Sequence, residues 1–172
     1  MRVERHKGQV MDKLFEVARR VGEKLKAHGQ TVAVAESSGG GLISAALLAV
    51  PGASAYFLGG AVVYTQQARG GLVGITDDDM KGLRSSSEPY AALLADRMRA
   101  NVNATWGLAE TGAAGPSGNR YGDPAGHTCI AIAGPKSETL TYRTGSDKRY
   151  DNMLAFAIKA LETLEGGIDA GG

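Results

Sequence analysis

The stretch from Thr31 to Leu42, T-V-A-V-A-E-S-S-G-G-G-L, constrains the fold more than any other part of the chain. Its first five residues are mostly apolar and rich in β-branched side chains, which predicts a buried strand. The chain then turns through polar residues and three glycines. Apolar residues recur at helical spacing from Leu42 until Pro51 and Gly52 end the pattern. A strand, a tight turn and a helix in this order are typical of an α/β fold.

The polar turn predicts either a helix cap or a binding site. Ser37 or Ser38 could cap the helix, because a serine oxygen accepts hydrogen bonds from N–H groups of the first turn. Gly39 and Gly40 favour the second interpretation, since each glycine at a helix start costs about 1 kcal/mol relative to alanine. Something must then approach the backbone closely. Together with Glu36, the turn could hold an anion or a developing oxyanion at the positive end of the helix dipole.

Length and composition exclude several classes of protein. The 172 residues are 43% hydrophobic, which predicts one globular domain over residues 1–172. The net charge is +1 and no basic cluster is interleaved with aromatic residues, so we expect no nucleic-acid partner. No stretch approaches the roughly 18 apolar residues of a membrane span, so we expect a cytoplasmic protein with no membrane partner. The single Cys129 excludes an internal disulfide and a two-cysteine metal site.

Alternating periodicities predict a three-layer α/β/α sandwich around a mixed, mainly parallel sheet. Strands are expected at residues 31–35, 60–65, 106–111, 127–133 and 138–144, the last two as an antiparallel hairpin. Helices are expected at residues 9–28, 42–50, 66–72 and 88–102, in a short segment at the capping-box sequence Thr76–Asp79, and after a capping Ser146. We expect an ordered core over about residues 9–165 and a disordered glycine-rich tail at 166–172.

Polar residues follow three of these strands. Ser37, Tyr64 and Thr111 each lie at a predicted carboxyl end, and Thr111 opens a second glycine-rich turn, Gly112–Gly118. Ligands of α/β proteins bind outside the carboxyl ends of parallel strands. If these strands are parallel neighbours, the sequence predicts one shared crevice that contains two hydroxyls, a phenol, the carboxylate of Glu36 and two glycine-rich turns.

Four ordered motifs resemble the C-terminal domain of the CinA family. They are A-E-S-S-G-G-G-L at 35–42, P-G-A-S-A-Y-F at 51–57, V-Y-T-Q-Q-A-R at 63–69 and T-G-A-A-G-P-S-G at 111–118. The resemblance covers roughly residues 10–164, and the family includes stand-alone nicotinamide mononucleotide deamidases. It implies an amidohydrolase that converts nicotinamide mononucleotide and water to nicotinate mononucleotide and ammonia. It also implies no metal or organic cofactor, a small-molecule nucleotide substrate and a homo-oligomer.

The same resemblance implies roles for individual residues. Ser37 matches the serine nucleophile, and Tyr64 and Thr111 match the active-site tyrosine and hydroxyl residue. Arg149 matches an arginine that could hold the substrate phosphate. The other expected substrate-binding residues are Glu36, Ser38, Gly39, Gly40, Gly112 and Gly115.

This chain departs from the family pattern at positions that matter for catalysis. Ser38 and Gly39 replace the Cys and Thr of the usual A-E-S-C-T-G-G, and Arg69 replaces a lysine thought to activate the serine. A desolvated lysine can lose its proton near neutral pH, whereas arginine, with a pKa above about 12, cannot. Glu36 could replace that base only if the turn rotates it inward.

Removing a general base costs about 10² to 10⁴ in rate. We therefore expect a conserved fold, a nucleotide-sized pocket and weakened deamidase activity. Two alternatives stay open: a nucleotide-binding pseudoenzyme of the same fold, and a structural module whose glycine turns only allow tight packing.

Overall fold

A five-stranded mixed sheet forms the middle layer of the protein, whose computed structural model describes residues 2–171. The strands are β1 (Val32–Glu36), β2 (Phe57–Val62), β3 (Trp106–Ala113), β4 (His127–Ala133) and β5 (Glu138–Arg143), in the spatial order β2-β1-β3-β4-β5. β1 pairs in parallel with β2 and β3, and β4 pairs antiparallel with β3 and β5. Only β4 runs against the other four strands, which confirms the predicted mixed, mainly parallel sheet.

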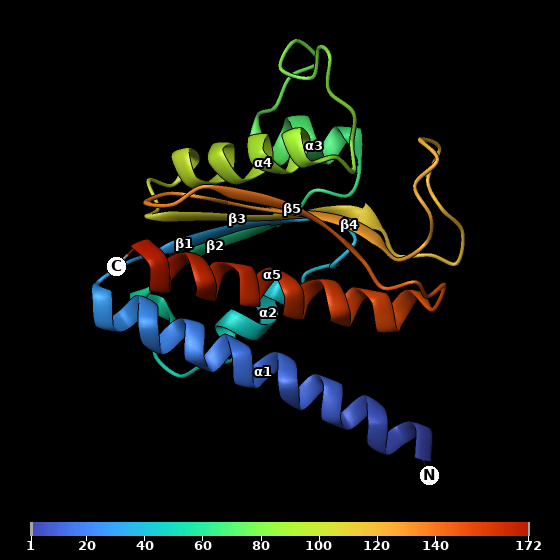
Figure 1. Ribbon diagram of the computed structural model, residues 1–172. Coiled ribbons are helices and arrows are strands. Elements are labelled where there is room, and N and C mark those ends of the chain that lie inside the picture. The colour runs from blue at the N-terminus through green and yellow to red at the C-terminus, as the bar shows by residue number, and fades with distance from the viewer. Residues whose placement is uncertain (1, 172) are drawn as a thin grey trace.

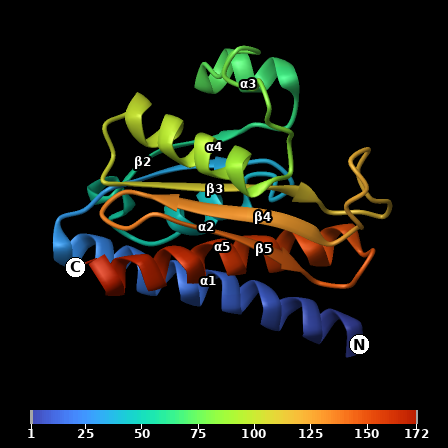
Figure 2. The ribbon, with the colours of Figure 1, turned by 45° about the horizontal axis from the view of Figure 1, so that its top comes forward.

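Helices cover both faces of this sheet (Figures 1 and 2). They are α1 (Arg2–His28), α2 (Leu42–Leu48), α3 (Gln66–Val73), α4 (Glu88–Asn101) and α5 (Arg149–Gly171), with a short 3₁₀ turn η1 (Ala53–Ala55). α3 and α4 lie on one face, and α1, α2 and α5 lie on the other (Figure 1). The predicted three-layer α/β/α architecture is confirmed.

Each face of the sheet has its own apolar core. Val32 and Val34 of β1 pack toward α1, α2 and α5, whereas Ala33 and Ala35 point toward α4. Small residues dominate the α4 side because the helix packs very close to the sheet. A Cβ atom added at Gly107 would lie 1.9 Å from the carbonyl oxygen of a residue in α4, so only glycine fits there.

Strand β2 begins three residues earlier than predicted. Residues 60–65 were expected, because Val62 and Val63 favour a strand, but β2 spans Phe57–Val62. β2 pairs only with β1, and this ladder ends where Glu36 pairs with Val62. Tyr64 therefore lies two residues beyond the strand, in the connection to α3.

Two residues that were predicted to begin helices do not cap a helix in the structure. Thr76 and Asp79 make the reciprocal bonds of a capping box, with each residue's backbone N–H donating to the other's side chain at 2.8 and 3.2 Å, but a turn follows instead of a helix. Ser146 accepts a bond from the Lys148 N–H at 3.2 Å, and α5 begins only at Arg149. In contrast, Ser87 caps α4 as predicted.

Both ends of the ordered core extend further than expected. α1 begins at Arg2 rather than near residue 9, and α5 continues through Gly171, so the expectation of a disordered tail is wrong for residues 166–171. The last turns of α5 pack into the core, because Gly167 and Ile168 are buried and a Cβ at Gly167 would lie 2.4 Å from Ile132. Residue 172 lies outside the described residues.

Candidate functional site

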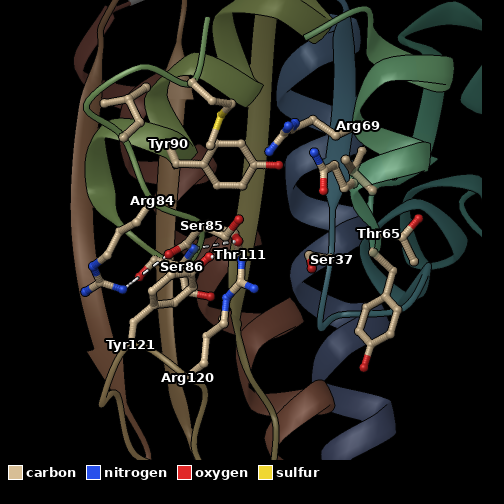
Figure 3. Close-up of a pocket in the computed structure, with 16 residues that line it drawn as sticks. Ser37, Thr65, Arg69, Arg84, Ser85, Ser86, Tyr90, Thr111, Arg120 and Tyr121 are labelled. Carbon is tan, nitrogen blue, oxygen red and sulfur yellow. Dashed lines mark hydrogen bonds between the residues drawn. The ribbon is translucent and has the colours of Figure 1, made fainter. Parts of the chain in front are cut away.

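A pocket of about 660 Å³ opens at the carboxyl ends of β1 and β3 (Figure 3). Of the expected site residues, Ser37, Tyr64, Arg69, Thr111 and Gly112 line it. The chain thus brings the serine, the tyrosine and the threonine to one hollow, as the strand ends predicted. Six other expected residues, Glu36, Ser38, Gly39, Gly40, Gly115 and Arg149, are not among its lining residues.

The turn that carries Ser37 is held by a carboxylate that the sequence analysis missed. One oxygen of Glu110, on β3, accepts bonds from the backbone N–H groups of Ser37 at 3.1 Å and Gly39 at 2.7 Å. The other oxygen accepts bonds from the hydroxyls of Ser38 at 2.5 Å and Thr128 at 2.6 Å. Glu110 is completely buried. Burial raises the pKa of Glu110, and these hydrogen bonds oppose that rise.

Glu36 is the internal cap of α2 rather than a substrate-binding residue or a general base. Its carboxylate accepts bonds from the N–H groups of Gly41, Ile43 and Ser44 at 2.7, 3.2 and 2.9 Å, and from the Ser44 hydroxyl at 2.9 Å. Glu36 has no exposed surface. The expectation of an external anion at this helix start is therefore wrong, because the chain's own carboxylate occupies the position.

The other residues of the turn are fixed inside the fold. Ser38 is only 4% exposed. A Cβ at Gly39 would lie 3.0 Å from a Glu36 oxygen and 3.3 Å from a Glu110 oxygen, so the glycine separates two buried carboxylates. Gly40 adopts a φ of +65°, which favours glycine. The groups that approach these glycines belong to the same chain: two carboxylates at Gly39 and the Met153 side chain at Gly40.

Thr111 lies at the floor of the pocket. Its hydroxyl accepts a bond from the backbone N–H of Ser86 at 3.3 Å, which leaves the hydroxyl proton to donate elsewhere. Ser86 has a φ of +56°, unusual for a residue other than glycine, and lines the pocket as well. Behind it, His127 Nε2 lies 3.0 Å from the Ser86 carbonyl oxygen.

Arg69 is buried in the pocket wall and is paired with an acid. It is 9% exposed, and its Nη2 donates to Asp77 at 2.6 Å. Its Nε is buried and has no hydrogen-bond partner among the described residues. A paired guanidinium stays protonated, so Arg69 can attract an anion but cannot accept a proton.

Two further arginines and a tyrosine form the opposite wall (Figure 3). Arg84 and Arg120 lie 5.2 and 5.1 Å from the centre of the Tyr121 ring. Arg84 also binds both oxygens of Asp123, at 2.7 and 3.2 Å. A hydrogen bond from Arg120 lowers the pKa of Tyr121. The residues next to Arg84 in the sequence do not indicate that it lines the pocket. Its side chain is held there by Asp123, which lies 39 residues further along the chain.

Arg149 reaches the pocket only through Tyr64. It donates to the Tyr64 phenol at 3.0 Å and to the carbonyl oxygen of Gly115 at 2.6 Å. Gly115 has a φ of +109°, and a Cβ there would lie 2.6 Å from the Asp147 carbonyl oxygen. The space beside Gly115 is therefore occupied by the protein's own backbone. Tyr64 itself is 60% exposed.

The charged residues that line the pocket are all arginines. They are Arg69, Arg84 and Arg120, and the lining residues include no lysine, histidine, aspartate or glutamate. Such a wall favours an anionic ligand. It does not offer a side chain whose ordinary pKa suits proton abstraction near neutral pH.

The side chains that the structure describes, those of residues 8–171, include no group of three or more His, Cys, Asp or Glu that could hold a metal ion. Over the same residues, no helix is both long and apolar enough to cross a bilayer.

Comparisons with known proteins agree on one family. The family model of the CinA C-terminal domain matches residues 14–168. A CinA-like protein of Desulfosudis oleivorans is 41% identical over 145 residues, and one of Nostoc is 37% identical over 123 residues. These matches cover 84% and 72% of this chain but only 35% and 29% of the relatives, so the chain spans about a third of their length.

Solved structures show the same fold. The competence/damage inducible protein CihA of Agrobacterium tumefaciens has a TM-score of 0.81 and 30% identity, covering 91% of this chain and 96% of its own. A CinA superfamily protein of Klebsiella pneumoniae has a TM-score of 0.85 at 24% identity, with 91% and 98% coverage.

Proposed function

The chain belongs to the CinA C-terminal domain family, and we propose that it binds nicotinamide mononucleotide and slowly hydrolyses its carboxamide. The products would be nicotinate mononucleotide and ammonia. The observation that carries this proposal is the meeting of Ser37, Tyr64 and Thr111 in one pocket whose charged residues are all arginines.

The pocket supplies suitable groups for each part of such a substrate. A nucleotide phosphate is an oxyanion, and the planar guanidinium of Arg120 offers paired N–H donors to it. Arg120 and Ser37 line the same pocket, so one ligand that fills it could contact both. Tyr90 and Tyr121 also line the pocket and provide aromatic surface for the pyridine ring.

Ser37 is the proposed nucleophile. Its Oγ would bond to the carboxamide carbon, and the carbonyl would become an oxyanion. The proton of the Ser37 hydroxyl would pass through solvent water to the amide nitrogen, and the C–N bond would break as ammonia leaves. Water would then cleave the acyl-serine and release the carboxylic acid. Arg69 and the Thr111 hydroxyl can stabilise the oxyanion, but neither takes the serine proton efficiently at neutral pH. Slow turnover follows from that missing base.

A second candidate is nucleotide binding without turnover. The observation in its favour is the absence of lysine, histidine and carboxylates from the lining residues of the described pocket. Both candidates share the ligand, so a single set of measurements separates them.

The test is ammonia release from nicotinamide mononucleotide by the wild-type protein, Arg69→Lys and Ser37→Ala. We expect slow release by the wild type, none by Ser37→Ala, and an increase of up to about 10² in Arg69→Lys, because lysine can act as a base. The lysine variant should fold, since a methylene replaces the buried Nε that has no partner. A fast wild-type enzyme that the lysine slows would contradict the argument.

Ligand binding is measured on the same samples by thermal shift. Stabilisation by the nucleotide without ammonia from the wild type or Arg69→Lys would favour the binding candidate. Neither stabilisation nor ammonia would reject both candidates.

The expected homo-oligomer rests on the family resemblance, and the expected cytoplasmic location rests on the sequence. We propose a cytoplasmic homo-oligomer, and light scattering of the purified protein at several concentrations tests the assembly. A strictly monomeric protein would contradict it.

A further inference from the structure

Two buried carboxylates bind most of the backbone N–H groups in the turn that carries Ser37. Glu36 and Glu110 lie opposite each other in the pairing of β1 with β3, and both have no exposed surface. Glu36 accepts hydrogen bonds from backbone N–H groups at the helix end of the turn, beginning with that of Gly41. Glu110 takes the serine side, through the N–H groups of Ser37 and Gly39. Each acid therefore binds a different part of the turn.

We infer that Glu110 is a positioning residue for Ser37, a role that rests on the proposed function because it treats Ser37 as the nucleophile. Glu110 does not line the pocket, so it would act only through the backbone that it holds. It fixes the N–H of the serine itself and that of the residue two positions later, which sets the direction of the Ser37 side chain. Reaction rates are sensitive to such placement, since a shift of 1 Å can cost about 10².

The position of Glu110 in β3 connects it directly to the pocket. Successive strand residues point to opposite faces, so Glu110 faces the turn while Thr111 faces the pocket. The same strand segment thus orients the serine through one residue and supplies a hydroxyl through the next. Thr128 on β4 binds the second oxygen of Glu110 and anchors it to the neighbouring strand.

Packing at Gly39 supports a specific role for this acid. The motif A-E-S-C-T-G-G has a threonine where this chain has Gly39, and a Cβ there would lie 3.3 Å from a Glu110 oxygen. A Glu36 oxygen would lie 3.0 Å away, so a side chain at position 39 would require a small shift of both carboxylates. A buried carboxylate has a large desolvation cost, and an apolar side chain in the same strand position would avoid it. We attribute its presence to the four hydrogen bonds it accepts around Ser37.

The two oxygens of Glu110 differ in whether an amide NH₂ group could take their place. One faces two backbone N–H groups and must stay an acceptor, whereas the other faces only hydroxyls, which rotate to accept as well as donate. Glu110→Gln can therefore keep all four contacts, with its carbonyl oxygen toward the turn. Glu110→Leu has a similar size and suits a buried strand, but it keeps none of the four side-chain contacts. The Ser37 N–H retains its second acceptor, the main-chain carbonyl oxygen of residue 110 at 3.0 Å, so the Gly39 N–H and the Ser38 hydroxyl are the groups that lose their partner.

The experiment compares these two variants with the wild type in three measurements. Hydrogen exchange at residues 37–39 reports the position of the turn, labelling of Ser37 by a fluorophosphonate reports its reactivity, and ammonia release gives kcat and KM for nicotinamide mononucleotide. We expect Glu110→Leu to lose exchange protection at Gly39, whose N–H donates to the Glu110 side chain, and to lower labelling and kcat by about tenfold or more, with KM little changed. Glu110→Gln should retain most of all three.

Two results would overturn the inference. One is unchanged exchange protection of the Gly39 N–H in a folded Glu110→Leu variant, and the other is a Glu110→Gln variant as impaired as Glu110→Leu. Absence of ammonia and labelling in the wild type would instead reject the proposed function. Because hydrogen exchange does not require turnover, it would still decide whether Glu110 positions the turn.

Discussion

Glu36 caps α2 from inside the fold, so replacing it by glutamine should destabilise the protein substantially. One oxygen accepts bonds from the N–H groups of Gly41 and Ile43, and the other from the N–H and the hydroxyl of Ser44. Each oxygen thus faces at least one backbone N–H, and a backbone N–H can only donate a hydrogen bond. Whichever way a glutamine amide turns, its NH₂ group meets a backbone donor.

The size of the effect follows from these contacts. A buried donor left without an acceptor costs about 1–3 kcal/mol. Losing a negative charge at a helix N-terminus costs about 0.3–1 kcal/mol, and up to about 2 in partly buried sites. No other side chain can take over, because Gly41 at the cap position has none. Since a neutral amide is easier to bury than a carboxylate, we expect a net loss of about 2–3 kcal/mol.

Urea denaturation of Glu36→Gln measures this loss, with Glu110→Gln as the matched control. Both residues are buried acids on neighbouring strands, but one oxygen of Glu110 faces only hydroxyls. The control should lose about 1 kcal/mol, because those hydroxyls can rotate. If both variants lost the same free energy of unfolding, with equal m-values, the distinction between backbone N–H donors and rotatable hydroxyls would be refuted.

Two other predictions concern α5 and its contacts with α1. Ile168 is completely buried, so Ile168→Ala should cost about 2–4 kcal/mol in the same assay, whereas a disordered tail would show no change. Arg20 binds both oxygens of Glu165 at 3.0 and 2.9 Å, and this hydrogen bonding lowers the pKa of Glu165 from its usual 4.5. The pair therefore stabilises the fold above that pH and loses its effect as pH falls through the lowered value. Glu165→Gln should flatten the acid side of the stability–pH curve, and an unchanged curve would contradict the sign.

The sequence predicted those parts of the molecule whose signals are local. Apolar periodicity identified the strands and helices, and the polar residues at the strand ends identified the pocket. Ser37, Tyr64 and Thr111 share that pocket because parallel strands β1, β2 and β3 end at one edge of the sheet. Even Tyr64 was placed there, although β2 ends two residues before it.

Features that depend on distant partners could not be predicted. Glu110 lies in an apolar stretch, and nothing nearby in the sequence shows that its acceptors bind a turn 73 residues earlier. The glycines after residue 165 indicated disorder, but Gly167 is required where α5 packs against Ile132. Arg84 joined the pocket only through its pairing with Asp123.

The two buried carboxylates also explain where the protein can bind an anion. A glycine-rich turn at a helix start ordinarily offers its N–H groups to a ligand. Here Glu36 and Glu110 accept most of those bonds, so an external anion at the turn would have to displace a carboxylate. The positive charge that faces the pocket comes instead from Arg69, Arg84 and Arg120. Under the proposed function, a ligand phosphate should therefore bind at the wall that carries Arg120, while Ser37 and Arg69 face the carboxamide end of the ligand.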